Sequence, residues 1–299
     1  MTLLLLLACS DQGFESLVFD DTFVQLDVEH KTDVLFVVDD SASMEEEQDR
    51  LAANFGAFVD VLATSYADWQ VGVVTTDVVS ASAGVLRGGV LTADTPELDA
   101  AFRAAVVAGT DGSRDEQGLA AAVLASDAAR NPGFLRTGAR FNVVFVSDED
   151  DHSDLGVQSY VASLESTAGD GLAAHALVGD LPAGCASGTS AADAGGRYLE
   201  AADITAGFVE SICSDDYAGL LTRVGLDVAG LDDTFPLSRL PAEDSLEVAV
   251  DDVVIPNRAT DGWTYSLGDN AIVFHGRAVP RAGMGIVVSY EKWLGPGPE

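Results

Sequence analysis

Positive charge is scarce in this sequence. Its 299 residues include 15 lysines and arginines against 49 aspartates and glutamates, which gives a formal net charge of −34. Only two of the basic residues are lysines, Lys31 and Lys292. A surface of this kind repels nucleic acids and anionic membranes, and the sequence has no basic cluster that could overcome the repulsion. We therefore expect no nucleic-acid partner and no electrostatic attachment to a membrane.

Long apolar runs are also missing. No segment approaches the roughly 18 consecutive apolar residues that a transmembrane helix needs. Hydrophobic residues nevertheless make up 47% of the chain, and the mean hydropathy is +0.20, so the chain can fill a folded core. A chain of this length is expected to form one large domain and a small one.

Cysteine occurs only three times. Cys9 follows a run of leucines, and Leu6-Leu7-Ala8-Cys9 resembles the lipobox of bacterial lipoproteins, in which the cysteine carries the lipid. The resemblance implies a signal peptide and lipidation site in residues 1–9. Residues 10–30 read as a tether that becomes ordered towards its end. The resemblance also implies a place in the bacterial cell envelope, as an outer-membrane or surface lipoprotein that contacts the membrane only through its lipid anchor. The alternative is a chance cysteine without this role.

The other two cysteines, Cys185 and Cys213, form an even pair. In the oxidising compartment that lipidation of Cys9 implies, such a pair is expected to form a disulfide, and a reduced pair is the alternative. A zinc site is not expected, because neither residue has a second cysteine or a histidine nearby at ligand spacing.

The most informative motif is a short apolar run followed by polar oxygens. Val34 to Val38 read as a strand buried on both faces, and Asp39, Ser41 and Ser43 follow it directly, before a predicted helix. A carboxylate and two hydroxyls at the mouth of an open α/β sheet form a set of hard oxygen ligands for a divalent cation. The alternative is an ordinary helix N-cap, which needs only one such residue.

This motif resembles the first part of the metal-ion-dependent adhesion site (MIDAS) of von Willebrand factor type A (vWA) domains, Asp-x-Ser-x-Ser. Family members carry a threonine on a second loop, five residues before a glycine. Here Ser113 stands five residues before Gly118, with Thr110 as a competing candidate. The third part is an aspartate after another buried strand, and Asp148 matches it. The resemblance covers roughly residues 31–230.

The resemblance implies a metal and a mode of binding. In the family the hydroxyls bind the cation directly and the carboxylates act largely through water. Ser41, Ser43 and Ser113 would then be direct ligands. Asp39 and Asp148 would act on the cation through water or be partly bound to it. All-oxygen coordination selects Mg²⁺, or Mn²⁺ or Ca²⁺, over zinc and copper. Because neutral hydroxyls donate little charge, the cation would attract a carboxylate of a partner protein as its last ligand.

The expected function is therefore that of an envelope lipoprotein that binds an acidic residue of a partner protein through a divalent cation. One alternative is a structural surface protein in which the metal only stabilises the fold. A second is a metal-dependent, phosphatase-like hydrolase. Against it, Asp39-Asp40-Ser41 replaces the Asp-x-Asp of such enzymes, no lysine follows in a later core loop, and no Gly-x-Ser-x-Gly, His-Glu-x-x-His or P-loop motif occurs. We expect no enzymatic activity.

Strands alternate with helices between residues 31 and 230, which predicts an α/β fold: a doubly wound, mostly parallel, Rossmann-like sheet of the vWA type. The predicted elements are strands at 34–38, 69–77, 84–91 (an edge strand), 141–147 and 172–180 (the last core strand), and helices at 44–64, 96–107, 115–128, 156–166 and 217–225. Residues 181–196 read as a loop. The acidic run 148–151 reads as a solvated loop or, alternatively, a second cation site, with His152 facing solvent.

Past residue 231 the pattern changes to short strands separated by turn residues. We expect a small all-β domain over 231–299, with a hairpin turn at 268–270 between Tyr265 and Ile272. The order of elements, with Ile212-Cys213 and this β segment, also resembles a group of vWA lipoproteins from bacteria of the myxobacterial kind.

Overall fold

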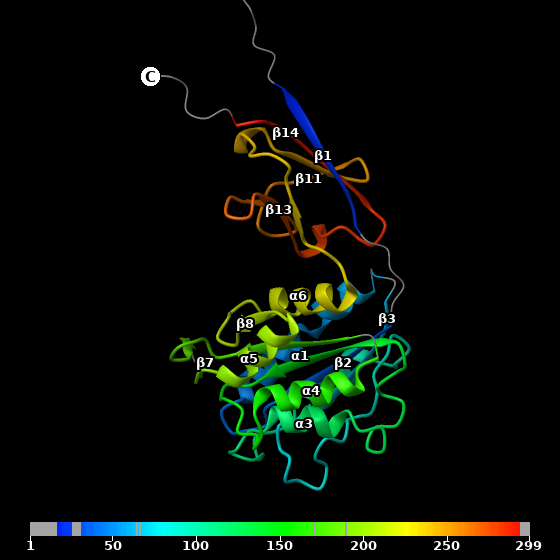
Figure 1. Cartoon of the computed structure of the whole chain (residues 1–299), viewed down its shortest axis with the longest axis vertical. Helices are drawn as coiled ribbons and strands as arrows, with labels where there is room; N and C mark the ends of the chain where they lie inside the picture. The colour runs from blue at the N-terminus through cyan, green and yellow to red at the C-terminus, as the bar shows by residue number, and fades with distance from the viewer. Residues whose placement is uncertain are drawn as a thin grey trace, which may run out of the picture. The chain divides into compact units, whose positions relative to one another are not determined.

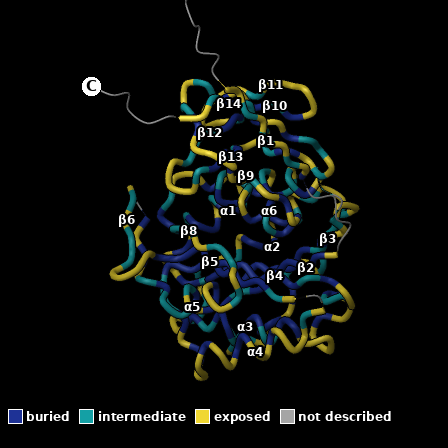
Figure 2. Tube along the Cα trace, turned by 45° about the horizontal axis from the view of Figure 1, so that its top comes forward, coloured by how far each residue is buried: buried dark blue, intermediate teal, exposed yellow. Residues whose placement is uncertain are grey.

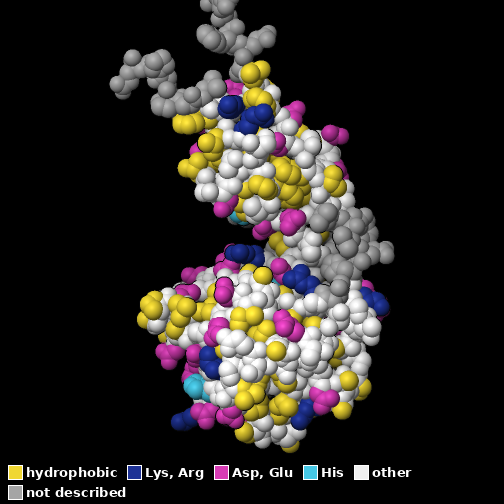
Figure 3. Space-filling view, in the orientation of Figure 1, with side chains coloured by type: hydrophobic (Ala, Val, Ile, Leu, Met, Phe, Trp, Pro, Cys, Tyr) yellow, Lys and Arg dark blue, Asp and Glu magenta, His cyan; other side chains and the backbone are white. Residues whose placement is uncertain are grey.

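A computed structural model describes residues 17–25, 31–63, 65, 67–169, 171–188 and 190–293. The predicted signal peptide and the lipidation site Cys9 lie outside these residues. The chain divides into two compact units, one spanning Leu26–Asp232 and one built from segments on both sides of it (Figure 1). No helix among the described residues is both long enough and apolar enough to cross a membrane. Acidic side chains are spread over both units (Figure 3).

The larger unit is built around a five-stranded parallel sheet with the strand order β3-β2-β4-β5-β8. Its second strand, β2, pairs in register with β3 on one side and with β4 on the other, so that Val34 lies between Val71 and Asn142. Seven of the eight residues of β2 are buried, as expected for a strand covered on both faces. The strands are β2 (Lys31–Val38), β3 (Asp68–Thr75), β4 (Ala139–Val146), β5 (Leu172–Val178) and β8 (Val209–Ser211).

Helices cover both faces of this sheet (Figures 1 and 2). On one face Phe36 of β2 makes edge-to-face contacts with Phe58 and Phe102, at centroid distances of 5.7 and 5.4 Å. On the other face Leu35 and Val37 belong to a core formed with α3, α4 and α5. The helices of the first face are α1 (Glu45–Leu62), α2 (Leu98–Val106) and α6 (Tyr217–Ala229), and those of the second are α3 (Gly118–Ala125), α4 (Val157–Thr167) and α5 (Gly196–Thr205). The predicted α/β fold is confirmed.

Two predictions about the edges of this sheet were wrong. Residues 84–91 form turns rather than an edge strand, and only Leu91 makes a bridge, to Val71. Gly84, Gly88 and Gly89 adopt positive φ angles of 67°, 73° and 83°, which breaks an extended strand. Strand β5 is also not the last of the sheet, because β8 pairs with it through three residues.

The segment that read as a loop, 181–196, holds regular structure. Strands β6 (Cys185–Ser187) and β7 (Ser190–Ala192) pair as a short antiparallel hairpin. Helix α5 begins at Gly196 and was not predicted. Its small residues Ala201 and Ala202 are buried with Tyr198 in the core shared with α3 and α4. Tertiary packing thus stabilises a helix whose glycine-rich start favours a loop.

The smaller unit consists of two antiparallel sheets, β1-β14-β10-β11 and β12-β13-β9. The predicted hairpin is confirmed, because Tyr265 pairs with Ile272. Within the predicted tether, residues 18–24 form β1 and pair with β14 along its whole length. The elements are β1 (Val18–Val24), β9 (Thr234–Pro236), β10 (Glu247–Val250), β11 (Val253–Ile255), β12 (Gly262–Ser266), β13 (Ala271–His275), β14 (Gly285–Glu291), and the 3₁₀ helices η1 (Glu243–Ser245) and η2 (Gly276–Ala278).

Candidate metal centre

Asp39 is fully buried at the carboxyl end of β2. Its Oδ1 atom accepts a hydrogen bond from the backbone N–H of Ser41 at 2.7 Å, and its Oδ2 atom accepts one from the hydroxyl of Ser147 at 2.7 Å. Burial raises the pKa of Asp39, and the bonds from Ser147 and Ser41 partly oppose this. The carboxylate is therefore held in one orientation by two neighbouring loops of the sheet.

Two serine hydroxyls and a second carboxylate lie beside Asp39. The Oγ atoms of Ser41 and Ser43 are 3.2 Å apart, and the Ser43 hydroxyl lies close enough to the Asp148 carboxyl to lower its pKa. Asp148 is 5% exposed, and its Oδ1 atom has no hydrogen-bond partner among the described residues. Burial, with the nearby carboxylates of Asp39 and others, raises the pKa of Asp148 to about 6. The structure thus brings together four residues of the predicted site.

The second predicted loop approaches the first through its backbone. The N–H of Gly112 donates to the carbonyl oxygen of Asp40 at 2.9 Å, and a Cβ atom at Gly112 would lie 2.4 Å from Asp40 Cγ, so only glycine fits. The Ser113 hydroxyl accepts a hydrogen bond from the N–H of Asp115. No hydrogen bond in the described structure joins Ser113 or Thr110 to the carboxylates or hydroxyls of the site. A role for either hydroxyl stays a prediction.

The same loop carries a buried acid that sequence reasoning missed. Glu116 is 0% exposed, and neither of its carboxylate oxygens accepts a hydrogen bond within the described structure. Burial, with the carboxylates of Asp39 and Glu149, raises the pKa of Glu116 to about 8. The available signal was a carboxylate within the loop already assigned to metal binding, two residues before Gly118. A glutamate in a polar loop is usually exposed, so its sequence neighbourhood offered no reason to single out Glu116.

The acidic run 148–151 after β4 is not a solvated loop at its two ends, which are buried. Asp151 is 3% exposed. One of its oxygens accepts a hydrogen bond from the N–H of Leu119 at 3.0 Å, in the first turn of α3, and the other accepts one from Arg197 Nε at 2.9 Å. Asp151 therefore caps a helix and pairs with an arginine, which also argues against its holding a second cation. His152 next to it is half-exposed, as predicted.

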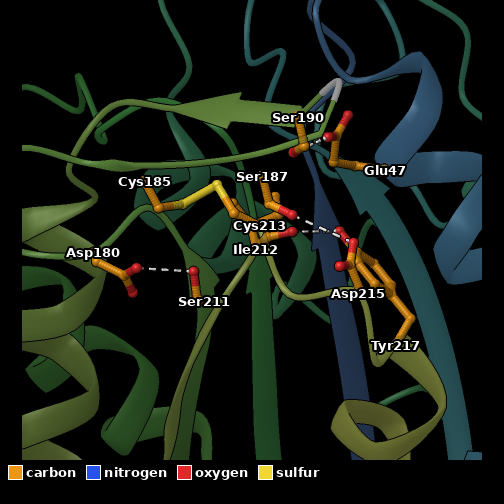
Figure 4. Close-up of a disulfide and its surroundings, with 10 residues drawn as sticks. All are labelled: Glu47, Asp180, Cys185, Ser187, Ser190, Ser211, Ile212, Cys213, Asp215 and Tyr217. Atoms are coloured by element: carbon orange, nitrogen blue, oxygen red, sulfur yellow. Dashed lines mark hydrogen bonds between the residues drawn. A yellow bond between two sulfur atoms is a disulfide. The ribbon is translucent and has the colours of Figure 1, made fainter.

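The predicted disulfide is confirmed: Cys185 and Cys213 are bonded, with their Cα atoms 6.1 Å apart (Figure 4). It ties the β6–β7 hairpin to the segment after β8. From this hairpin the Ser190 hydroxyl donates to the buried carboxylate of Glu47 in α1 at 2.6 Å. The N–H of Asp193, just past β7, donates to the carbonyl oxygen of Asp148 at 2.8 Å. The hairpin is thus attached to two segments that build the site.

The donor set fits a hard divalent cation. It offers two hydroxyls and two buried carboxylates, and one carboxylate oxygen of Asp148 is left without a donor. In the described structure no arginine or lysine pairs with Asp39 or Asp148. Within the same residues no group of three or more His, Cys, Asp or Glu side chains is arranged to hold a metal. A cation here would therefore depend on the hydroxyls of Ser41 and Ser43, as oxygen-selective sites allow.

Comparisons with known proteins bear on the fold. No protein-family model matches the sequence, and no curated protein matches it. Among solved structures, the open conformation of the pilus adhesin SpaC from Lactobacillus rhamnosus GG has a TM-score of 0.52 at 12% identity, covering 94% of this chain and 42% of the adhesin. Proximal thread matrix protein 1 from the mussel byssus, with a zinc-occupied MIDAS motif, has a TM-score of 0.42 at 15% identity, covering 73% and 51%. BatB from Bacteroides thetaiotaomicron has a TM-score of 0.41 at 12% identity, covering 67% and 98%.

These likenesses concern the fold alone. This chain spans less than half the length of the adhesin, at 12% identity. The parallel sheet with helices on both faces is the predicted α/β architecture, and the likeness to the adhesin concerns this fold. The resemblance to myxobacterial lipoproteins stays a prediction.

Proposed function

We propose that this protein binds a partner protein through a divalent cation, Mg²⁺, Mn²⁺ or Ca²⁺, held at the carboxyl end of β2. Asp39, Ser41, Ser43 and Asp148 would hold it, and a carboxylate of the partner would complete its coordination. The single observation that carries the proposal is the buried Oδ1 atom of Asp148, which has no hydrogen-bond donor although the Ser43 hydroxyl lies near this carboxyl.

The argument is electrostatic. A buried carboxylate costs several kcal/mol unless a cation or hydrogen bonds compensate it. Asp39 receives two hydrogen bonds and Asp148 is only partly satisfied, so a positive charge between them would stabilise both. Because the rest of the protein has a net charge of −34, a cation would also supply the positive centre that an acidic partner requires.

A place on the cell surface agrees with this function. A pilus adhesin shares the fold, and we extend adhesion from that protein to this chain only as part of the proposal. We further propose that Cys9 carries a lipid that anchors the protein in the bacterial envelope. Cells fed a labelled fatty acid should then yield a labelled protein, and Cys9→Ala should abolish the label. An unlabelled, unprocessed wild-type protein would refute the lipid anchor and would leave the proposal of a metal site unaffected.

The decisive test of function is metal-dependent capture of a partner. The immobilised protein should retain a protein from envelope extracts of its source organism in Mg²⁺ and release it into chelator at unchanged salt. Asp148→Ala should prevent capture while the domain stays folded. Asp154→Ala is the matched control, because Asp154 is an exposed acid on the same loop, and it should capture normally. A partner whose binding ignores both chelator and Asp148→Ala would favour a purely structural role for the metal.

A further inference from the structure

Glu116 has no explanation in the proposed function. It is the third residue before Leu119, in the loop that leads into α3, and its side chain is completely buried. Neither of its carboxylate oxygens accepts a hydrogen bond in the described structure. Buried carboxylates in folded proteins are ordinarily bonded by several donors, so this acid either stays protonated or, when ionised, requires a compensating group.

The charges around Glu116 make the requirement stronger. The acids that act on it most are Asp39 and Glu149, and both repel its negative charge. Among the described basic side chains, only His152 lies within 4.0 Å of Glu116, with its Nδ1 atom 3.8 Å from Glu116 Oε2, and its ring is half-exposed. Arg197, on the neighbouring helix, is already paired with Asp151. The protein's own side chains therefore leave this acid without an adequate counter-charge.

The backbone attaches Glu116 to loops at the edge of the sheet that carries the predicted metal site. Its carbonyl oxygen accepts a hydrogen bond of 2.7 Å from the N–H of His152, in the loop after β4. The next N–H, of Gln117, donates to the carbonyl oxygen of Thr76 just after β3. Because β3 and β4 flank β2, the residue is fixed between the loops on either side of Asp39.

We propose that Glu116 supplies a carboxylate to the divalent cation, in the role that the resemblance to vWA domains gives to the hydroxyl of Ser113 or Thr110. The inference rests on the proposed metal site and goes beyond it. A cation with an additional carboxylate ligand carries less residual positive charge. It is therefore held more tightly in the absence of a partner, and it attracts a partner's carboxylate less strongly than a site made of hydroxyls does.

The experiment is a titration of the full chain with Mn²⁺ alone, followed by calorimetry or by electron paramagnetic resonance of free Mn²⁺. Glu116→Gln should weaken Mn²⁺ binding by about tenfold or more, because ligand charge sets affinity in oxygen-only sites. Ser113→Ala and Thr110→Ala, changed on the same loop, are the matched controls and should leave the affinity unchanged. Glu116→Asp, which keeps the charge on a shorter side chain, should give an intermediate affinity.

Thermal unfolding of the metal-free protein provides a second, independent measurement. At a pH above the pKa of about 8, where Glu116 is ionised, Glu116→Gln should raise the melting temperature, because it removes an uncompensated buried charge, whereas loss of a merely structural acid would lower it. Unchanged Mn²⁺ affinity in Glu116→Gln, with affinity lost in Ser113→Ala or Thr110→Ala, would overturn this inference and leave the proposed function standing. Equal affinity in wild type and in Ser41→Ala/Ser43→Ala, or no Mn²⁺ binding by the wild type, would overturn both.

Discussion

Removing the disulfide should destabilise the larger unit and loosen the metal site together. The bond between Cys185 and Cys213 closes a loop with a sequence separation of 28 residues. In the chain-entropy account a loop of this length contributes about 3–4 kcal/mol, because it restricts the unfolded chain. For a domain of this size each kcal/mol corresponds to about 2–4 °C in melting temperature, so the loss should be on the order of 10 °C.

The assay compares thermal unfolding of the wild type with that of Cys185→Ala/Cys213→Ala, each with and without reductant. Reductant should lower the melting temperature of the wild type to that of the double variant and leave the double variant unchanged. Because the hairpin tied by this bond holds Glu47 through Ser190 and contacts the backbone of Asp148, Mn²⁺ should also bind more weakly. Equal melting temperatures in all four samples would refute the stability argument, and unchanged Mn²⁺ affinity would refute the link to the site.

Two further predictions concern buried charges of the same unit. Burial lowers the pKa of His175 to about 4 from its ordinary 6.5, so the unfolded chain takes up a proton at a higher pH than the folded protein does. The free energy of unfolding should therefore fall as the pH drops from 6.5 towards 4, by up to roughly 3 kcal/mol. In urea unfolding measured across this pH range, His175→Gln should reduce the pH dependence of the free energy of unfolding. An unchanged pH dependence would refute the role given to His175. Arg136→Ala should cost about 3–5 kcal/mol in chemical unfolding, because it leaves Asp33, 1% exposed, without its arginine. Arg103→Ala, which breaks only the exposed pair with Asp49, should cost less than about 1 kcal/mol, and equal costs would contradict the argument from burial.

The core of the fold follows from local sequence. Val34 to Val38 form an apolar run of strand length, and the amphipathic helix after them faces the sheet with Phe55 and Phe58, both fully buried. Such patterns depend only on neighbouring residues, so strand β2, helix α1 and the parallel order could be predicted. The first loop of the site follows for the same reason, because Asp39 and its serines stand directly after a recognisable strand.

What could not be predicted depends on distant partners. Strand β1 pairs with β14, and Val18 lies opposite Glu291. Because this partner is distant in the sequence, no local pattern predicts that the N-terminal segment forms an edge strand. Helix α5 exists because Tyr198 finds a buried place beside α3 and α4. The burial of Glu116 is likewise set by loops after β3 and β4, and its sequence neighbourhood suggests an exposed acid. Residues that complete a site are thus the hardest to find when tertiary contacts alone bury them.

The central claim is that a divalent cation binds at Asp39, Ser41, Ser43 and Asp148, and thermal unfolding with and without Mg²⁺ or Mn²⁺ tests it most directly. At a metal concentration about 100 times the dissociation constant, mass action adds about 2.7 kcal/mol to the folded state. The melting temperature of the wild type should rise by about 5–10 °C, and a chelator should reverse the rise. Ser41→Ala/Ser43→Ala should unfold cooperatively and show no rise. An equal rise in the double variant, or none in the wild type, would contradict the account.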